Sequence, residues 1–245
     1  MIRRLFAIAG AVFLDAVKRR IVYLIVFFGV VMALAIPALP SYNVGVQAGV
    51  YREIALALTF GAALALTIGL SANRIPGEIE RRTVYGVLSK AVGRWEYVVG
   101  TWLGIFGVIG VCVLGFALVD IGVGQVVYAQ FMPRLLEGAF AIWLEMGIVA
   151  AFAVAVSGLS GAVVVTVASL TFLFAAHSRD SLFPNGAPQI VLTLFPSLDA
   201  FNVINPVAYG TGIGPVYAGI MTATFLGWVG LLLLLGSLGF ASKDL

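Results

Sequence analysis

Long apolar runs separated by short polar segments dominate the 245-residue chain. A helix that crosses a membrane needs about 20 mostly apolar residues, and six stretches meet or approach this length. These predicted spans are Ile21–Leu39, Ile54–Ala72, Tyr97–Val119, Leu135–Ser157, Ser160–His177 and Pro215–Phe240. The pattern predicts an all-α integral membrane protein with six transmembrane helices, forming a single domain over residues 1–245.

Two connections between the predicted spans differ from simple loops. Only Gly158 and Leu159 separate the fourth span from the fifth, and the combined run is too long for one crossing, so a tight hairpin is required. Residues 178–214 hold four prolines among apolar stretches. This segment is too apolar for a free loop and too broken for a span. It predicts short helices that partly re-enter the outer leaflet and pack on protein.

The composition excludes several other classes of protein. Hydrophobic residues make up 62% of the chain and charged residues 10%, against roughly 25% charged in soluble domains. The net charge of +3 is typical of basic cytoplasmic loops and does not predict nucleic-acid binding. With one cysteine and one histidine, no metal site is expected. No Gly-rich phosphate loop ending in Lys-Ser/Thr is present, so the chain has no ATP site of that kind.

The distribution of Lys and Arg predicts the orientation. Eleven of these residues lie before the first span, between the second and third spans, or after the sixth, and three lie in the other connections. Both termini are therefore predicted in the cytoplasm, in a multi-pass protein of the plasma (inner) membrane.

Residues 1–20 predict an amphipathic helix on the inner membrane surface. Leu5, Ala9 and Val12 fall on an apolar face together with Ile2, Phe6, Phe13 and Val17. Basic residues of such helices bind anionic lipid headgroups while the apolar face enters the membrane. The charged residues of this helix are Arg3, Arg4, Asp15, Lys18, Arg19 and Arg20.

Residues 73–96, between the second and third spans, concentrate charge in the stretch EIERRTVYGVLSKAVGR over Glu78–Arg94. Pro76 fits an early helical position, and Glu78 and Glu80 would then lie in the first turn, favourable to the helix dipole. The pattern predicts a short surface helix and a turn before the third span. A solvated loop that obeys the positive-inside rule is the alternative.

The longer stretch GEIERRTVYGVLSKAVGRWEYVVGTWLG resembles the signature of ABC-2 type permeases, the membrane subunits of ABC exporters. The matching positions are Glu78, Thr83, Leu88, Ser89, Arg94, Tyr97 and Gly100. Ala91 stands where the family usually has Pro, Thr101 where it has Lys, and Arg82 where Gly is common. Residue-level matching is concentrated in this stretch, while the predicted layout of spans resembles the family along nearly the whole chain.

The resemblance implies an exporter subunit that pairs with a second permease, as a homodimer or a related heterodimer. Two separate P-loop ATPase subunits would bind ATP and Mg and dock on the cytoplasmic face, so this chain would have no cofactor and no catalytic residue. The segment 73–96 would be the coupling helix, and membrane lipids would surround the spans. The coupling residues are Glu78, Glu80, Arg81, Arg82, Thr83, Ser89, Lys90 and Arg94.

One acid, Glu145, lies well inside a predicted span, where a charge is costly and by default marks function or a buried partner. It is a candidate for a translocation path, a dimer interface or a paired structural group. Phe183, Phe195 and Phe201 are candidates for contact with a lipidic substrate, although interfacial anchoring is the commoner use of such rings. Other polar residues are predicted at the outer surface or at the end of the fifth span: Asp120, Arg134, Glu137 and His177.

Two other functions remain open from the sequence. A secondary transporter driven by an ion gradient needs titratable groups in the membrane, but Glu145 is the only clear one and no internal repeat is evident. A non-transporting scaffold would recruit a cytoplasmic partner through Glu78–Arg94. An intramembrane enzyme is disfavoured because the spans hold no Ser-His, paired Asp or metal-binding constellation.

Overall fold

The computed structural model describes residues 2–18, 27–31, 44–80, 93–179 and 195–241, and this part of the chain contains no strand. Its α-helices are α1 (Ile2–Lys18), α3 (Val44–Glu80), α5 (Arg94–Tyr128), α6 (Leu135–Ser157), α7 (Ala162–His177), α10 (Ile204–Ala208) and α11 (Pro215–Ala241). A 3-10 helix, η2, covers Leu198–Phe201. The predicted all-α class is therefore confirmed.

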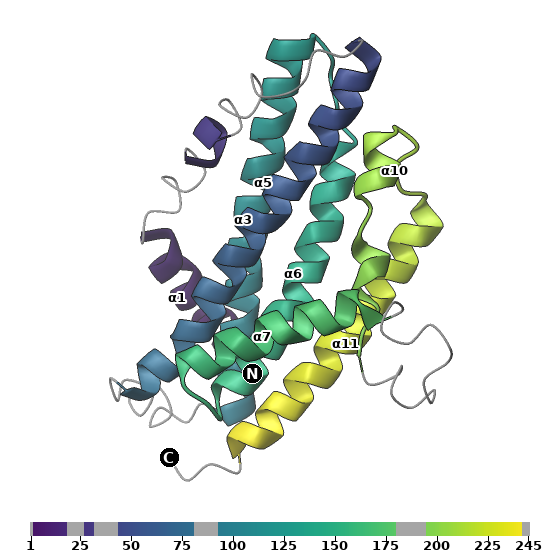
Figure 1. Ribbon diagram of the computed structural model, residues 1–245. Helices are drawn as coiled ribbons and strands as arrows, with labels where there is room; N and C mark the ends of the chain where they lie inside the picture. Colours follow the sequence, from purple (N-terminus) through teal and green to yellow (C-terminus); the bar gives the residue numbers. More distant parts are fainter. Residues whose placement is uncertain (1, 19–26, 32–43, 81–92, 180–194, 242–245) are drawn as a thin grey trace.

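Four helices, α3, α5, α6 and α11, are long and apolar enough to cross a membrane. They form an elongated bundle (Figure 1). We call the end where α3 and α11 finish and α5 starts the lower end, as drawn there, and the opposite end the upper end. Of the predicted first span, Ile21–Leu39, the structure describes only residues 27–31, which are helical, and the rest lies outside the described residues.

The helix at the predicted fifth span, α7, differs from the four long helices in length and direction. α7 has 16 residues, which at 1.5 Å each rise about 24 Å, less than the roughly 30 Å of a bilayer core. It begins at the lower end and crosses α3 and α6 obliquely (Figure 1). The hairpin before it is present: the N–H groups of Leu159 and Ser160 both donate to the Val156 carbonyl.

The second and third spans are longer than predicted. α3 starts at Val44 and ends at Glu80, and α5 continues to Tyr128. The prediction that Pro76 begins a separate short helix is wrong, because α3 passes through Pro76. Proline removes only one backbone donor near the end of the helix, while the neighbouring Ala72 and Ile75 are almost completely buried and keep this turn packed on the bundle.

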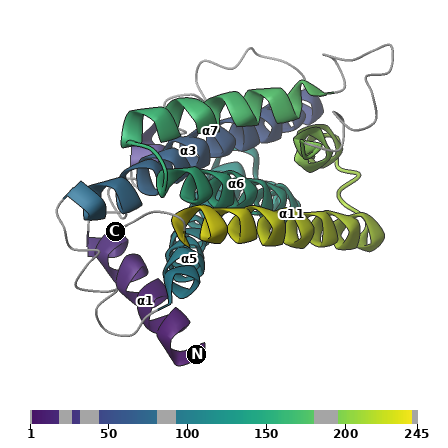
Figure 2. The same ribbon diagram turned by 90° about the horizontal axis from the view of Figure 1, so that it is seen from below.

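α6 is the central helix of the bundle. Viewed from below, it lies between α3 and α7 on one side and α5 and α11 on the other (Figure 2). Glycines permit the close packing: a Cβ at Gly147 would lie 2.6 Å from both Phe106 and Phe225, and one at Gly236 would lie 2.7 Å from the Cα of Ala155. Next to Gly147, the rings of Phe106 and Trp143 stack at 4.4 Å.

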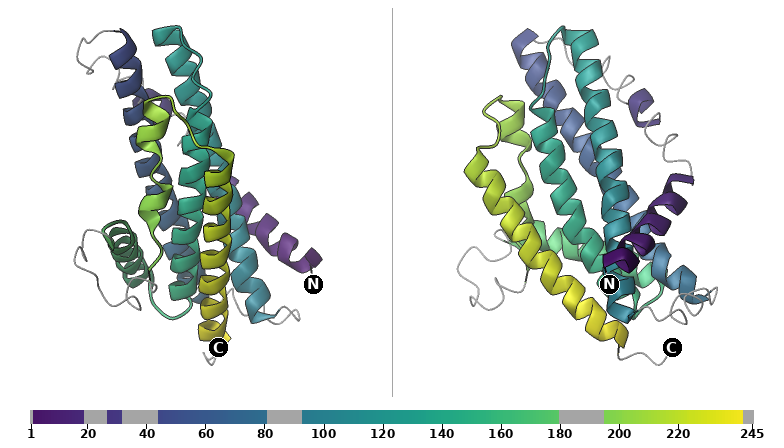
Figure 3. Two further views of the ribbon diagram at one scale, coloured as in Figure 1. Left: turned by 90° about the vertical axis from the view of Figure 1, so that its right-hand side faces the viewer. Right: turned by 180° about the vertical axis from the view of Figure 1, so that it is seen from behind.

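The predicted N-terminal helix is present as α1, but it packs on protein more than expected. Its buried residues Val12 and Ala16 face the bundle, whereas Phe6 and Leu14 are 67% and 58% exposed. α1 lies across the lower part of α5 (Figure 3). The carboxylate of Asp15, one of the charged residues of this helix, lies 2.5 Å from the guanidinium of Arg74 in α3.

Two glycines of α5 form the contact surface for α1. A Cβ at Gly104 would lie 2.6 Å from the Val12 Cβ and 2.7 Å from the Ala9 carbonyl, and one at Gly100 would lie 2.9 Å from Ile8. Small residues four positions apart let helices approach closely in membranes. The Asp15–Arg74 pair is partly exposed, and such pairs contribute at most about 1 kcal/mol. Packing on Gly100 and Gly104 is therefore the main attachment of α1.

This packing predicts that Gly104→Ala destabilises the protein by about 1–3 kcal/mol, because the added methyl group meets the α1 backbone and must displace it. The measurement is the thermal unfolding midpoint of the detergent-purified protein. Gly122→Ala is the matched control in the same helix, since nothing lies within 4 Å of its added Cβ. Equal midpoints for the two variants would show that α1 is not held in this way.

Candidate functional site: a buried acid–histidine pair beside a pocket

The central feature of the candidate site is Glu145, near the middle of α6. Its side chain is only 2% exposed, and its Oε1 lies 3.5 Å from Nε2 of His177, the last residue of α7. No hydrogen bond joins this oxygen to a described group. The oblique course of α7 thus brings its C-terminal end to the one acid that the sequence places deep in a span.

Glu145 and His177 line a pocket of about 230 Å³. Its wall is assembled from α3, α6, the end of α7, and the segment that includes η2 and the start of α10. Gly138 allows α3 to approach α6 here, because a Cβ would lie 2.6 Å from Leu56. The lining residues are Leu56, Phe60, Gly138, Ile142, Glu145, His177, Phe201, Asn202, Val203 and Ile204.

The structure brings together two of the four candidate translocation residues. Glu145 and Phe201 both line the pocket, and Phe201 is almost completely buried. Phe195 is not a lining residue: its ring lies 6.3 Å from Phe172, and its carbonyl accepts a hydrogen bond from Arg179. Phe183 lies outside the described residues.

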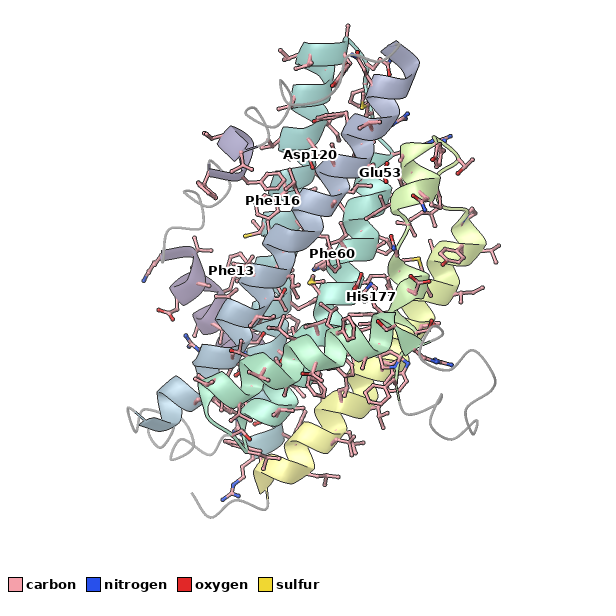
Figure 4. All side chains as sticks on the ribbon, in the orientation of Figure 1. Phe13, Glu53, Phe60, Phe116, Asp120 and His177 are labelled. Carbon is pink, nitrogen blue, oxygen red and sulfur yellow. The ribbon has the colours of Figure 1, made fainter. Side chains whose placement is uncertain are left out.

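Sequence reasoning missed the pairing of His177 with Glu145. His177 does end the fifth predicted helix, as expected, and its ring also makes an edge contact with Phe60 at 6.0 Å (Figure 4). The signal available in the sequence was the short Gly158–Leu159 hairpin, which folds α7 back along α6. The oblique angle that places the end of α7 beside Glu145 depends on tertiary packing.

The position of a second buried acid, Asp120, differs from the prediction. Asp120 was expected at the outer surface, but α5 continues past it to Tyr128 and Asp120 is 1% exposed. The Thr59 hydroxyl donates to its Oδ2 at 3.0 Å, and the Tyr51 hydroxyl donates to its backbone carbonyl at 2.6 Å. These contacts join α5 to α3, and Asp120 is labelled on α5 in Figure 4.

The other two residues predicted at the outer surface lie near the upper end. Arg134 is exposed and immediately precedes α6. Glu137 is half-buried, and its Oε2 accepts a hydrogen bond of 2.6 Å from the backbone N–H of Ile213. Glu137 therefore holds the segment before α11 against α6.

Most of the predicted coupling residues lie outside the described part of the chain: Arg81, Arg82, Thr83, Ser89 and Lys90. Glu78 and Glu80 belong to the last turn of α3 rather than to the first turn of a new helix. Arg94 begins α5, and its guanidinium donates to the Phe240 carbonyl of α11 at 3.3 Å. One residue earlier, the Gly93 N–H donates to the carboxylate of Glu96 at 3.0 Å, which caps the start of α5.

The predicted charged residues of the N-terminal helix also lie partly inside and partly outside the described residues. Arg3, Arg4 and Lys18 are exposed, as a helix at a headgroup surface requires, and Asp15 pairs with Arg74. Arg19 and Arg20 lie outside the described residues.

The fold and these sites define a helical, multi-pass membrane protein with buried carboxyl groups inside its bundle. Comparison with protein-family models and with curated proteins finds no match to the chain. Within the described ranges, no three His, Cys, Asp or Glu side chains are grouped so that they could hold a metal ion.

The buried Asp120 contact predicts that Thr59→Val lowers the stability of the protein by about 1–3 kcal/mol, because the nearly isosteric change leaves a buried carboxyl oxygen without its donor. Thr59→Ser, which keeps the hydroxyl, should lose less. Thermal unfolding of both detergent-purified variants tests this, and an equally stable Thr59→Val would show that the hydrogen bond is dispensable.

Proposed function

We propose that the protein is the membrane subunit of an ABC-2 type transporter. It exports a substrate using ATP hydrolysed by separate P-loop ATPase subunits. The observation that carries the proposal is the charged stretch Glu78–Arg94, which follows the family pattern and connects two helices of membrane-spanning length.

The anchoring of this stretch at both ends supports a coupling role. On one side, Arg74 of α3 pairs with Asp15 of α1 shortly before Glu78. On the other, Arg94 is bonded to the end of α11, and α1 packs on α5 at Gly100 and Gly104. A force applied to the stretch would therefore reach α1, α3, α5 and α11 together, as a coupling element requires.

The assembly follows from the same proposal. The protein lies in the inner membrane with its lower end facing the cytoplasm, so that Glu78–Arg94 contacts the ATPases. Two ATPase subunits hold ATP and Mg, and salt-bridging side chains of the stretch fix the register of docking. A second permease subunit, identical or related, completes the membrane part.

A second candidate function, ion-gradient-driven transport, is favoured by a different observation. Secondary transporters need titratable groups inside the membrane, and the bundle buries Glu145 beside His177 and, separately, Asp120. Transport that continues without ATPase partners and collapses with the ion gradient would favour this candidate. Stable ATPase partners without any transport would instead indicate a scaffold.

Charge reversal at the proposed docking site is the direct test. Glu78→Lys should abolish most of the transport and uncouple ATP hydrolysis from it, because a docking contact becomes repulsive, while membrane insertion stays intact. The measurements are co-purification of a P-loop ATPase from the native host, identified by mass spectrometry, and ATP hydrolysis by the complex.

Glu53→Lys is the matched control for this experiment. Glu53 is exposed near the upper end of the same helix (Figure 4), so the same change of charge should leave coupling unaltered. Unchanged transport in Glu78→Lys, or a purified protein that carries no ATPase, would overturn the proposal.

A further inference from the structure

We propose that the pocket beside Glu145 is a binding site for a small organic cation: a protonated amine attached to a compact apolar group. This inference names the substrate class and thus rests on the proposed transport function, although the binding itself needs no ATPase.

The charge of the pocket favours a cation. The side chain of Glu145 is only 2% exposed. An ionised carboxylate at such depth is costly without a partner. Asp199, an exposed residue of η2, is a second acid in the segment that supplies Phe201 to the pocket wall. Among the described residues that line the pocket there is no Lys or Arg.

The existing partner of Glu145 leaves room for a further donor. His177 approaches to 3.5 Å but makes no hydrogen bond with Oε1 of Glu145, which is buried without a hydrogen-bond partner among the described groups. Buried carboxyl oxygens are normally satisfied. An ammonium group offers this oxygen both N–H donors and a positive charge, whereas an alcohol offers only a donor.

The wall of the pocket is apolar and includes aromatic rings, so it fits an apolar or aromatic group. Phe60 and Phe201 line it together with aliphatic side chains such as Leu56 and Ile142. Aromatic rings attract cations in addition to providing apolar surface. The volume of about 230 Å³ lies below the roughly 300–1,000 Å³ of pockets for drug-sized ligands. The site therefore suits one ring or a short branched group, or the cationic head of a longer amphiphile.

The test is equilibrium binding of three matched probes to the full chain in phosphatidylcholine nanodiscs. The probes are benzylammonium, benzyl alcohol and benzoate, which share a ring and differ in charge. Calorimetric titration, with empty nanodiscs subtracted for partitioning, should show that benzylammonium binds at least tenfold more tightly than benzyl alcohol and that benzoate does not bind.

Variants then assign the binding to this pocket. Glu145→Gln keeps the shape and should weaken benzylammonium binding by at least roughly tenfold, as for loss of one partner of a buried charge pair, with little effect on benzyl alcohol. Phe201→Leu should weaken it by about two- to fivefold. Asp120→Asn is the matched control, because it removes a buried acid that does not line the pocket.

Equal affinity for benzylammonium and benzyl alcohol, no binding above empty nanodiscs, or unaltered binding in a folded Glu145→Gln variant would each overturn the proposal. The comparison of probes on the wild-type chain decides the question even if a variant does not fold. Amine binding by a protein that carries no ATPase would overturn the proposed function and leave this site standing. A complex with an ATPase whose permease does not bind the amine would overturn the proposed site and leave the proposed function standing.

Discussion

Close packing of the other helices on α6 is the constraint on which the rest of the structure depends. At Gly138, Gly147 and Gly158, an added Cβ would lie within 3 Å of a side chain from α3, α5 or α11. Association of helices in lipid gains little from the hydrophobic effect and depends on such contacts. Because the helices approach so closely, the polar groups of α6 and α5 are shut away from lipid and must find partners within the protein.

Two of the buried acids, Asp120 and Glu145, have different surroundings. Asp120 receives the Thr59 hydroxyl on Oδ2 and so links α5 to α3, while its Oδ1, like Oε1 of Glu145, has no hydrogen-bond partner among the described groups. Glu145 has a histidine nearby without a hydrogen bond to Oε1 and a pocket beside it. The pocket and the histidine beside Glu145, rather than burial or an unpartnered oxygen, distinguish this candidate binding group from the structural acid Asp120.

The sequence predicted features set by length and composition: the helical class, the long apolar helices and the hairpin at Gly158–Leu159. It failed where tertiary packing decides. Pro76 looked like the start of a helix, but burial of Ile75 carries α3 through it. Asp120 looked like a surface residue because the predicted third span ends at Val119, but α5 continues helically to Tyr128. The approach of His177 to Glu145 joins residues 32 positions apart through the angle of α7, which no local pattern encodes.

The course of α3 offers a physical route between the proposed docking stretch and the pocket. Leu56 and Phe60 on the pocket wall belong to the same uninterrupted helix as Glu80, about 30–36 Å away at 1.5 Å per residue. A helix of this length transmits displacement along its axis with little deformation, and its one proline lies in the last turns before the docking stretch. At the far end, Leu56 is packed against Gly138 of α6. A shift of α3 would therefore change the pocket wall directly, so that an occupant held by Glu145 on α6 would experience a different cavity.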